Sequence, residues 1–201
     1  MCNDSSVGSI LRSCKNVGTM NLENTNLTNQ CFDGLSLPVL KNVNISGCFN
    51  ISDLSWLRKS NKLERLTSCG VNLLTSEGVN NCLVNMKCLK SINFASCHLF
   101  TDRLLTNALS FNSSLKISLV EIDLSGCIRL TDAGVKNLTE NFRNIVSLSM
   151  ARCRRITDNS TNYITNNLFM LKTLNLKGCK GISKSALKRL LELLRGISLQ
   201  V

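Results

Sequence analysis

The sequence is poor in several residue types, and each shortage excludes some classes of protein. It has one proline, one histidine, one tryptophan and one tyrosine in 201 residues, and aromatic residues make up only 4%. No run approaches the ~18 apolar residues of a membrane-spanning helix, and the N-terminal residues lack the basic and apolar regions of a secretory signal. We therefore expect no membrane association and a reducing intracellular compartment, namely the cytoplasm, with a cilium or the nucleus as alternatives.

Patterns typical of catalytic and metal sites are also missing. The eleven cysteines include no C-x-x-C pair, and the single histidine, His98, cannot complete a common zinc site. No glycine-rich phosphate loop or dinucleotide fingerprint is present. Cys97 and His98 are adjacent, but the first belongs to a repeat position and the second to a turn. We expect no enzyme activity, no metal, no cofactor and no small-molecule substrate.

Two carboxylates come closer to a catalytic arrangement than any other pair. Glu121 and Asp123 share one face of an expected strand, where strand geometry would separate them by about 6 to 7 Å. That strand belongs to an open sheet without an evident pocket, so we interpret the pair as a solvated acidic spot.

The sequence does contain an internal repeat. A string beginning Leu124-Ser-Gly-Cys127 recurs with substitutions at residues 150 and 176, which places equivalent cysteines 26 residues apart. This period is that of a leucine-rich repeat, in which Leu119, Ile122 and Leu124 occupy the L-x-x-L-x-L positions and Cys127 the fourth position. The same offsets fit residues 17–201, with steps of 23, 23, 26, 30, 26 and 26 residues between fourth positions.

One repeat is degenerate and one is longer than the others. In the repeat that begins at Leu63, Ser68 stands at the third apolar position and Val71 replaces the cysteine. The 30-residue step contains an insertion around residues 115–118. The first repeat has Thr25 at its fourth position, and the last ends before reaching one.

The residue types of the repeat have physical reasons. Alternation along each short strand directs apolar side chains inward and polar side chains outward. Thr131 followed by Asp132 predicts a helix N-cap, and Val135, Leu138 and Phe142 recur at helical spacing behind it. Cysteine is small and commonly buried, so we expect the registered cysteines to be core residues. These are Cys48, Cys97, Cys127, Cys153 and Cys179.

The expected fold is therefore an α/β leucine-rich-repeat solenoid, a right-handed horseshoe with a parallel concave sheet and convex helices. A repeat array buries one continuous core, so residues 17–201 are expected to form one domain, with residues 1–16 as an N-terminal cap. Residues 185–194 are expected to form the last helix, because four leucines fall on one face of it.

The pattern resembles the cysteine-containing leucine-rich repeats of F-box/leucine-rich-repeat proteins, of the antagonist-of-mitotic-exit family and of leucine-rich subunits of the ciliary dynein regulatory complex. Residues 119–135, 145–158 and 171–187 carry the resemblance. The best-known members hold a protein substrate of a ubiquitin ligase on the concave face and dock to the ligase through an F-box ahead of the repeats. Only about sixteen residues precede the first repeat here, so the resemblance implies a relative without an F-box.

The net charge of +11 does not fall on the expected concave face. Outward strand positions there are small and polar and sum to −1, which suits a phosphate backbone poorly. Trp56 and Tyr163 fall outside this face, so it lacks aromatic anchors. Candidate contact residues on it are Asn93, Glu121, Asp123, Ser149 and Asn175.

Basic residues instead gather at the turns that follow the strands. Equivalent turns of neighbouring repeats stack, so these side chains are expected to form a ridge along one edge of the C-terminal half. We call this set the basic ridge: Arg129, Arg152, Arg154, Arg155, Lys177 and Lys180.

The sequence thus favours a non-enzymatic interaction scaffold with protein partners. It would act as an adaptor related to ubiquitin-ligase substrate receptors or as a fixed subunit of a large assembly such as a ciliary complex. The alternative is a basic subunit that contacts nucleic acid or a ribonucleoprotein through the ridge, a partner less favoured because the ridge has no aromatic side chains to stack on bases.

Overall fold

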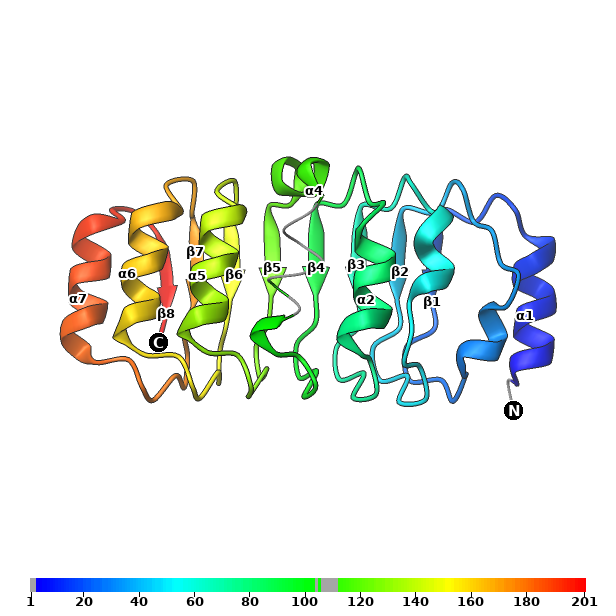
Figure 1. Cartoon of the computed structure of the whole chain (residues 1–201), viewed down its shortest axis with the longest axis horizontal. Coiled ribbons are helices and arrows are strands. Elements are labelled where there is room, and N and C mark those ends of the chain that lie inside the picture. The colour runs from blue at the N-terminus through cyan, green and yellow to red at the C-terminus, as the bar shows by residue number, and fades with distance from the viewer. Residues whose placement is uncertain (1–2, 104, 106–111) are drawn as a thin grey trace.

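Eight short strands stand side by side in one parallel sheet, in chain order from β1 to β8 (Figure 1). The computed structural model describes residues 3–103, 105 and 112–201. Strand centres pair in register, as Ile122 does with Leu148 and Leu148 with Leu174. The strands are β1 (Thr19–Asn21), β2 (Asn42–Asn44), β3 (Arg65–Thr67), β4 (Ser91–Asn93), β5 (Glu121–Asp123), β6 (Ser147–Ser149), β7 (Thr173–Asn175) and β8 (Ser198–Gln200).

Helices cover one side of this sheet, the side that faces the viewer in Figure 1. The two 23-residue steps hold only 3-10 helices, whereas the 26-residue steps hold α-helices of eight or ten residues, because three more residues add almost one helical turn. The insertion expected around 115–118 lies within α4. The helices are α1 (Asp4–Ser13), η1 (Asn29–Phe32), η2 (Ser55–Lys59), α2 (Ser76–Leu83), α4 (Ser113–Ser118), α5 (Asp132–Asn141), α6 (Asp158–Asn167) and α7 (Lys184–Leu193).

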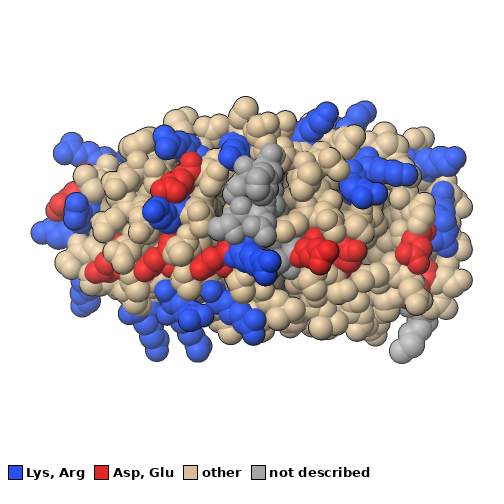
Figure 2. Space-filling view, viewed as in Figure 1, with Lys and Arg blue, Asp and Glu red and all other residues tan. Residues whose placement is uncertain are grey.

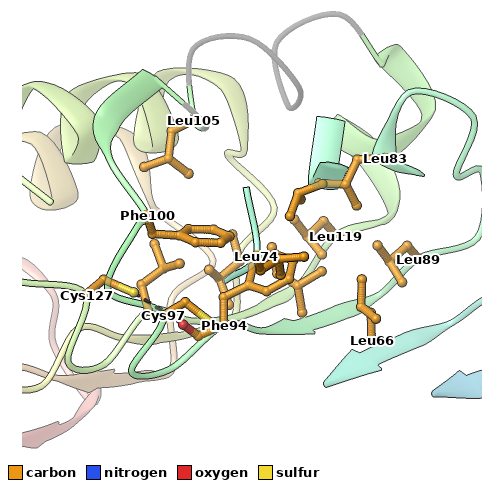
Figure 3. Close-up of a cluster of buried hydrophobic side chains, with 14 of the residues drawn as sticks. Leu66, Leu74, Leu83, Leu89, Phe94, Cys97, Phe100, Leu105, Leu119 and Cys127 are labelled. Atoms are coloured by element: carbon orange, nitrogen blue, oxygen red, sulfur yellow. Dashed lines mark hydrogen bonds between the residues drawn. The ribbon is translucent and has the colours of Figure 1, made fainter. Parts of the chain in front are cut away.

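The core runs the length of the solenoid between the sheet and the helices. Figure 3 shows a part of it in which apolar side chains from successive repeats converge, including Phe94 and Phe100, whose ring centroids lie 4.6 Å apart. Within the described part of the chain, no helix is long and apolar enough to span a membrane.

The prediction that the registered cysteines are buried is confirmed. All five are buried free thiols, and each donates to a backbone carbonyl of the preceding repeat. Cys127 Sγ lies 3.3 Å from the oxygen of Phe94, and Cys153 Sγ lies 3.2 Å from that of Leu124. Burial raises the pKa of Cys153 to about 12 and that of Cys97 to about 11. These thiols therefore stay protonated at neutral pH.

The degenerate repeat keeps its place in the sheet. Val71 is fully buried at the cysteine position, and Ser68 is fully buried where other repeats have a large apolar residue. Among the described residues the Ser68 hydroxyl has no hydrogen-bond partner, although the Ser68 carbonyl accepts from the thiol of Cys97 at 3.1 Å. A buried hydroxyl without a partner costs stability, so Ser68 is a weak point of the core.

A left-handed backbone recurs at one position of the repeat, the residue just before the fourth position. Glycine adopts this conformation without strain because it has no Cβ. Arg152 also adopts it, with φ +60°, although an arginine carries a Cβ. A Cβ at the neighbouring Gly178 would lie 3.4 Å from Cγ of Arg152. Seven repeats share this conformation, at Asn24, Gly47, Gly70, Ser96, Gly126, Arg152 and Gly178.

Candidate functional site

The six residues of the basic ridge lie on the turns between the strands and the helices of the C-terminal half. All six are exposed. Figure 2 shows Lys and Arg side chains gathered along the lower edge of this half, below a row of acidic side chains.

Backbone pairing orders these turns. Arg129 pairs with Thr101, and Arg155 with Thr131, in isolated parallel bridges outside the main sheet. The amide of Arg152 donates to the carbonyl of Lys177 at 2.8 Å. The ridge side chains therefore project from a backbone that is held on both sides.

Aspartates of successive repeats form a ladder of hydrogen bonds between repeats. Asp158 accepts from the amide of Ser183 at 2.6 Å and from its hydroxyl at 2.7 Å. Asp102 makes the same pair of contacts with Thr131, and Asp4 with Thr28. Each acceptor in this aspartate ladder, defined as Asp4, Asp102, Asp132 and Asp158, binds the helix-capping residue of the next repeat.

No salt bridge among the described residues includes a side chain of the basic ridge. Among the described residues the salt bridges join Glu64 to Lys41 at 3.9 Å, Glu64 to Lys90 at 2.9 Å, and Arg65 to Glu121 at 3.6 Å. None of them includes a ridge residue. Six exposed cations are thus free to attract an acidic surface.

The concave face is the face of the sheet opposite the helices, and its candidate residues lie on β4 to β7. Asn93 Oδ1 accepts from the amide of Ala95 at 2.9 Å, and Asp123 and Asn175 make equivalent contacts with the residues two positions on. These side chains close the turn at the end of each strand, a local role typical of Asn and Asp. They are half-buried rather than freely displayed.

The other two concave candidates also have partners within the sheet. Ser149 Oγ lies 2.7 Å from Ser125 Oγ, and Glu121 pairs with Arg65. The concave face carries a shallow hollow of about 250 Å³ over β6 to β8, lined by Ser147, Leu148, Ser149, Thr173, Leu174, Asn175, Ser198 and Gln200. The residues that line this hollow are uncharged and offer hydroxyl and amide groups.

The adjacent pair Cys97 and His98 does not form a catalytic couple. Cys97 is buried with a raised pKa and donates to the carbonyl of Ser68, whereas His98 is exposed on the turn. A thiol nucleophile needs a lowered pKa, which this environment does not provide. Among the described residues, no group of three His, Cys, Asp or Glu side chains is arranged to hold a metal ion.

Comparison with known proteins shows the fold. No protein-family model and no curated protein sequence matches the chain. Among solved structures, the leucine-rich repeat-containing protein LegL7 from Legionella pneumophila is similar over 96% of this chain and 59% of its own, at 16% identity and a TM-score of 0.54. The chain has the leucine-rich-repeat fold. A chain in the crystal structure of the Rad7 and Elc1 complex in yeast is also similar, at 17% identity over 99% of this chain and 72% of that chain, with a TM-score of 0.44.

Some features of this leucine-rich-repeat protein were not expected from its sequence. In four consecutive repeats, one of the two residues after the fourth position is apolar and exposed, namely Phe49, Leu73, Leu99 and Ile128. In the last two repeats that have a fourth position, basic residues stand there instead, namely Arg154, Arg155 and Lys180. The offsets of the repeat could have located these residues in the turns, one or two positions after each fourth residue, but not their exposure. Cys31 and Cys82, which fall outside the cysteine register, are also buried in the core.

Proposed function

We propose that this protein is a non-enzymatic interaction scaffold whose basic ridge docks an acidic surface of a protein partner. The observation that carries the proposal is the row of six exposed cations that have no salt-bridge partner among the described residues. Such a row raises the local concentration of acidic partners and steers their approach. The concave candidates, in contrast, have most of their polar groups engaged within the sheet.

The role of such a scaffold takes one of two forms. As an adaptor related to ubiquitin-ligase substrate receptors, it binds its partner reversibly and depends on a separate chain for docking to the ligase. As a fixed subunit of a large assembly, such as a ciliary complex, it co-purifies with its neighbours in constant ratio. Affinity purification from the source cells, with quantification of partners by mass spectrometry, distinguishes these forms by stoichiometry and by resistance to washing.

Charge reversal tests the ridge itself. In the triple variant Arg152→Glu, Arg154→Glu, Arg155→Glu, we expect loss of partner co-purification, greatest at low salt where screening is weakest. Stability should change little, because exposed charges contribute about 0 to 1 kcal/mol each. The matched control replaces the concave residues Asn93, Glu121 and Asp123.

The outcomes separate the candidate surfaces. Partner binding that survives charge reversal but is lost in the concave variant assigns the function to the concave face. Binding of single-stranded RNA in place of an acidic protein, with a steep dependence on salt, assigns it to nucleic acid.

A further inference from the structure

Four exposed apolar side chains follow one another along the same edge of the solenoid as the basic ridge. Their exposed fractions are 57% for Phe49, 52% for Leu73, 37% for Leu99 and 43% for Ile128. Each lies one or two positions after the buried fourth residue of its repeat, in four consecutive repeats. We call these four residues the apolar stripe.

The apolar stripe and the basic ridge form one continuous surface. Arg129 directly follows Ile128, and the position of Ile128 in the next two repeats is taken by Arg154 and Lys180. In Figure 2 the lower edge carries Lys and Arg side chains under the C-terminal half and is mainly uncharged under the N-terminal half. The same turn of the repeat thus changes from apolar to basic at residues 128–129.

We infer that this two-part edge binds an amphipathic helix of a partner protein, with apolar residues on the stripe and carboxylates on the ridge. The inference rests on the proposed function, which it deepens by naming the form and chemistry of the partner. Apolar side chains aligned over several repeats are typical of protein contact sites. The ridge supplies the charge complementarity that sets the direction of the bound helix.

Spacing favours a helix over an extended segment. Neighbouring strands lie about 4.8 Å apart, and the turns that connect them to the helices are spaced at least as widely. One helical turn rises about 5.4 Å, so a helix along the edge presents about one side chain to each repeat. Side chains on one face of an extended segment are about 6.6 Å apart and fall out of step with the repeats.

A second copy of this chain does not fit the whole surface. If the apolar stripes of two copies packed together, the cations of both ridges would stay without acidic partners. If the two ridges packed together, like charges would face one another. The surface therefore calls for a partner that brings its own acidic groups.

A synthetic helical peptide tests this inference. The probe carries leucines at i, i+4, i+7 and i+11 and glutamates at i+14, i+15 and i+18, and a control peptide has the same composition with the leucines spread around the helix. Binding is measured by fluorescence anisotropy. The stripe variant is Leu73→Ser, Leu99→Ser, Ile128→Ser, and the ridge variant is the triple reversal at residues 152, 154 and 155. The matched control is Phe169→Ser, because Phe169 is 73% exposed in the turn after α6, away from the stripe.

We expect the probe to bind the unaltered protein more tightly than the control peptide does. The stripe variant and the ridge variant should each weaken binding by about tenfold or more, and Phe169→Ser should not change it. Circular dichroism checks folding, and Leu73→Ser alone replaces the triple stripe variant if that variant is unfolded.

Failure of the inference is distinguishable from failure of the proposed function. If both peptides bind equally and only the ridge variant weakens them, the stripe has no role and the helix inference is overturned, while the ridge function stands. If the ridge variant binds as tightly as the unaltered protein, the proposed function fails as well. An equal loss in Phe169→Ser shows nonspecific apolar adhesion and overturns the assignment of the stripe.

Discussion

The carboxylate of Asp132 accepts hydrogen bonds from both the backbone amide of Thr157, at 2.8 Å, and its hydroxyl, at 2.6 Å. Thr157 is the N-cap of α6, and its own hydroxyl accepts from the amide of Asn159 at 3.3 Å. Asp132 in turn is the first residue of α5. One aspartate therefore ties the start of one helix to the capping residue of the next, and in this way the convex layer is held in register between repeats.

Replacement of Asp132 by Ala is expected to lower the free energy of unfolding by about 2 kcal/mol, because hydrogen bonds to a charged acceptor are lost. The measurement is a denaturant titration. Glu140→Ala, an exposed residue of the same helix, is the matched control and should change stability by less than about 0.5 kcal/mol. An equal effect of the two substitutions would show that the ladder adds nothing to stability.

The contribution of Asp132 should depend on pH. Burial opposes its ionisation, but hydrogen bonds from Ser160 and Thr157 outweigh burial and lower the pKa of the carboxyl. A depressed pKa stabilises the folded state above the unfolded value of ~3.9, and the contribution is lost as pH falls through the folded value. The stability difference between Asp132→Ala and the unaltered protein should therefore be constant near neutrality and shrink below pH ~4. A difference that is unchanged in acid would contradict this assignment.

The cysteine core predicts a loss of stability in alkali. Burial raises the pKa of Cys153 to about 12, whereas an unfolded thiol ionises near ~8.5. The contribution of the Cys153 thiol to stability is therefore complete below pH ~8.5, and above that pH it declines by up to ~1.4 kcal/mol per pH unit. Cys153→Ala should be less stable at neutral pH but decline less steeply. Identical slopes for both proteins above pH 9 would exclude this thiol as a contributor.

Exposed and buried cysteines should differ in their rates of reaction with thiol reagents. Cys14 and Cys88 are exposed and should react with a membrane-impermeant alkylating reagent in the folded protein. The five registered cysteines should react only after unfolding, and reduction should not change the mass. Rapid labelling of Cys127 or Cys153 in the native state, detected by mass spectrometry of peptides, would contradict the buried register.

Ser68→Ala should stabilise the protein by about 1 kcal/mol, since it removes a buried hydroxyl that has no hydrogen-bond partner in the part of the chain that the structure describes, and it hardly changes the side-chain volume. Ser118→Ala is the control of opposite sign, because the Ser118 hydroxyl donates to the carbonyl of Leu89 at 2.8 Å. Thermal unfolding of both variants gives the comparison. A destabilised Ser68→Ala would indicate that the hydroxyl has a stabilising role.

Arg152→Gly should stabilise the protein by up to about 1 kcal/mol, or leave its stability unchanged, because glycine adopts the left-handed backbone without strain. Gly178→Ala, at the equivalent position with φ +75°, should destabilise it by about 1 to 2 kcal/mol. Denaturant midpoints measure both effects. If Arg152→Gly is clearly destabilised, the Arg152 side chain over Gly178 contributes more to stability than the backbone strain costs.

Much of the fold follows from spacing alone. The offsets counted back from Cys127 place Ile122 in a strand that the structure confirms, and the step lengths account for 3-10 helices in the short repeats and α-helices in the long ones. Burial of the registered cysteines follows from the same offsets, because a period shared with a parallel sheet puts equivalent residues in one layer. The turn position of the ridge was predictable for the same reason.

Contacts between repeats could not be predicted in this way. The sequence predicts that Thr131 and Asp132 form a local helix cap, and Thr131 does cap its own helix. The carboxylate of Asp132, however, accepts from the amide of Thr157, 25 residues further on. Asn93 and Asp123 read as displayed contact residues, yet their side chains close turns at the strand ends. Which polar group meets which depends on side-chain direction in three dimensions, and the period does not contain that information.

The architecture follows from the sequence alone, because a period of 26 residues with inward apolar positions has one way to bury its core, by stacking parallel strand–helix units. Which charged side chains are available to a partner depends on contacts in the folded protein. Glu64 forms a salt bridge with Lys90, and Asp158 accepts from Ser183, because folding brings these residues of different repeats together. Arg154 has no salt-bridge partner among the described residues. Folding also places Phe49, Leu73, Leu99 and Ile128 on the edge that ends in the basic ridge, because stacked repeats bring together residues that are more than twenty positions apart in the chain.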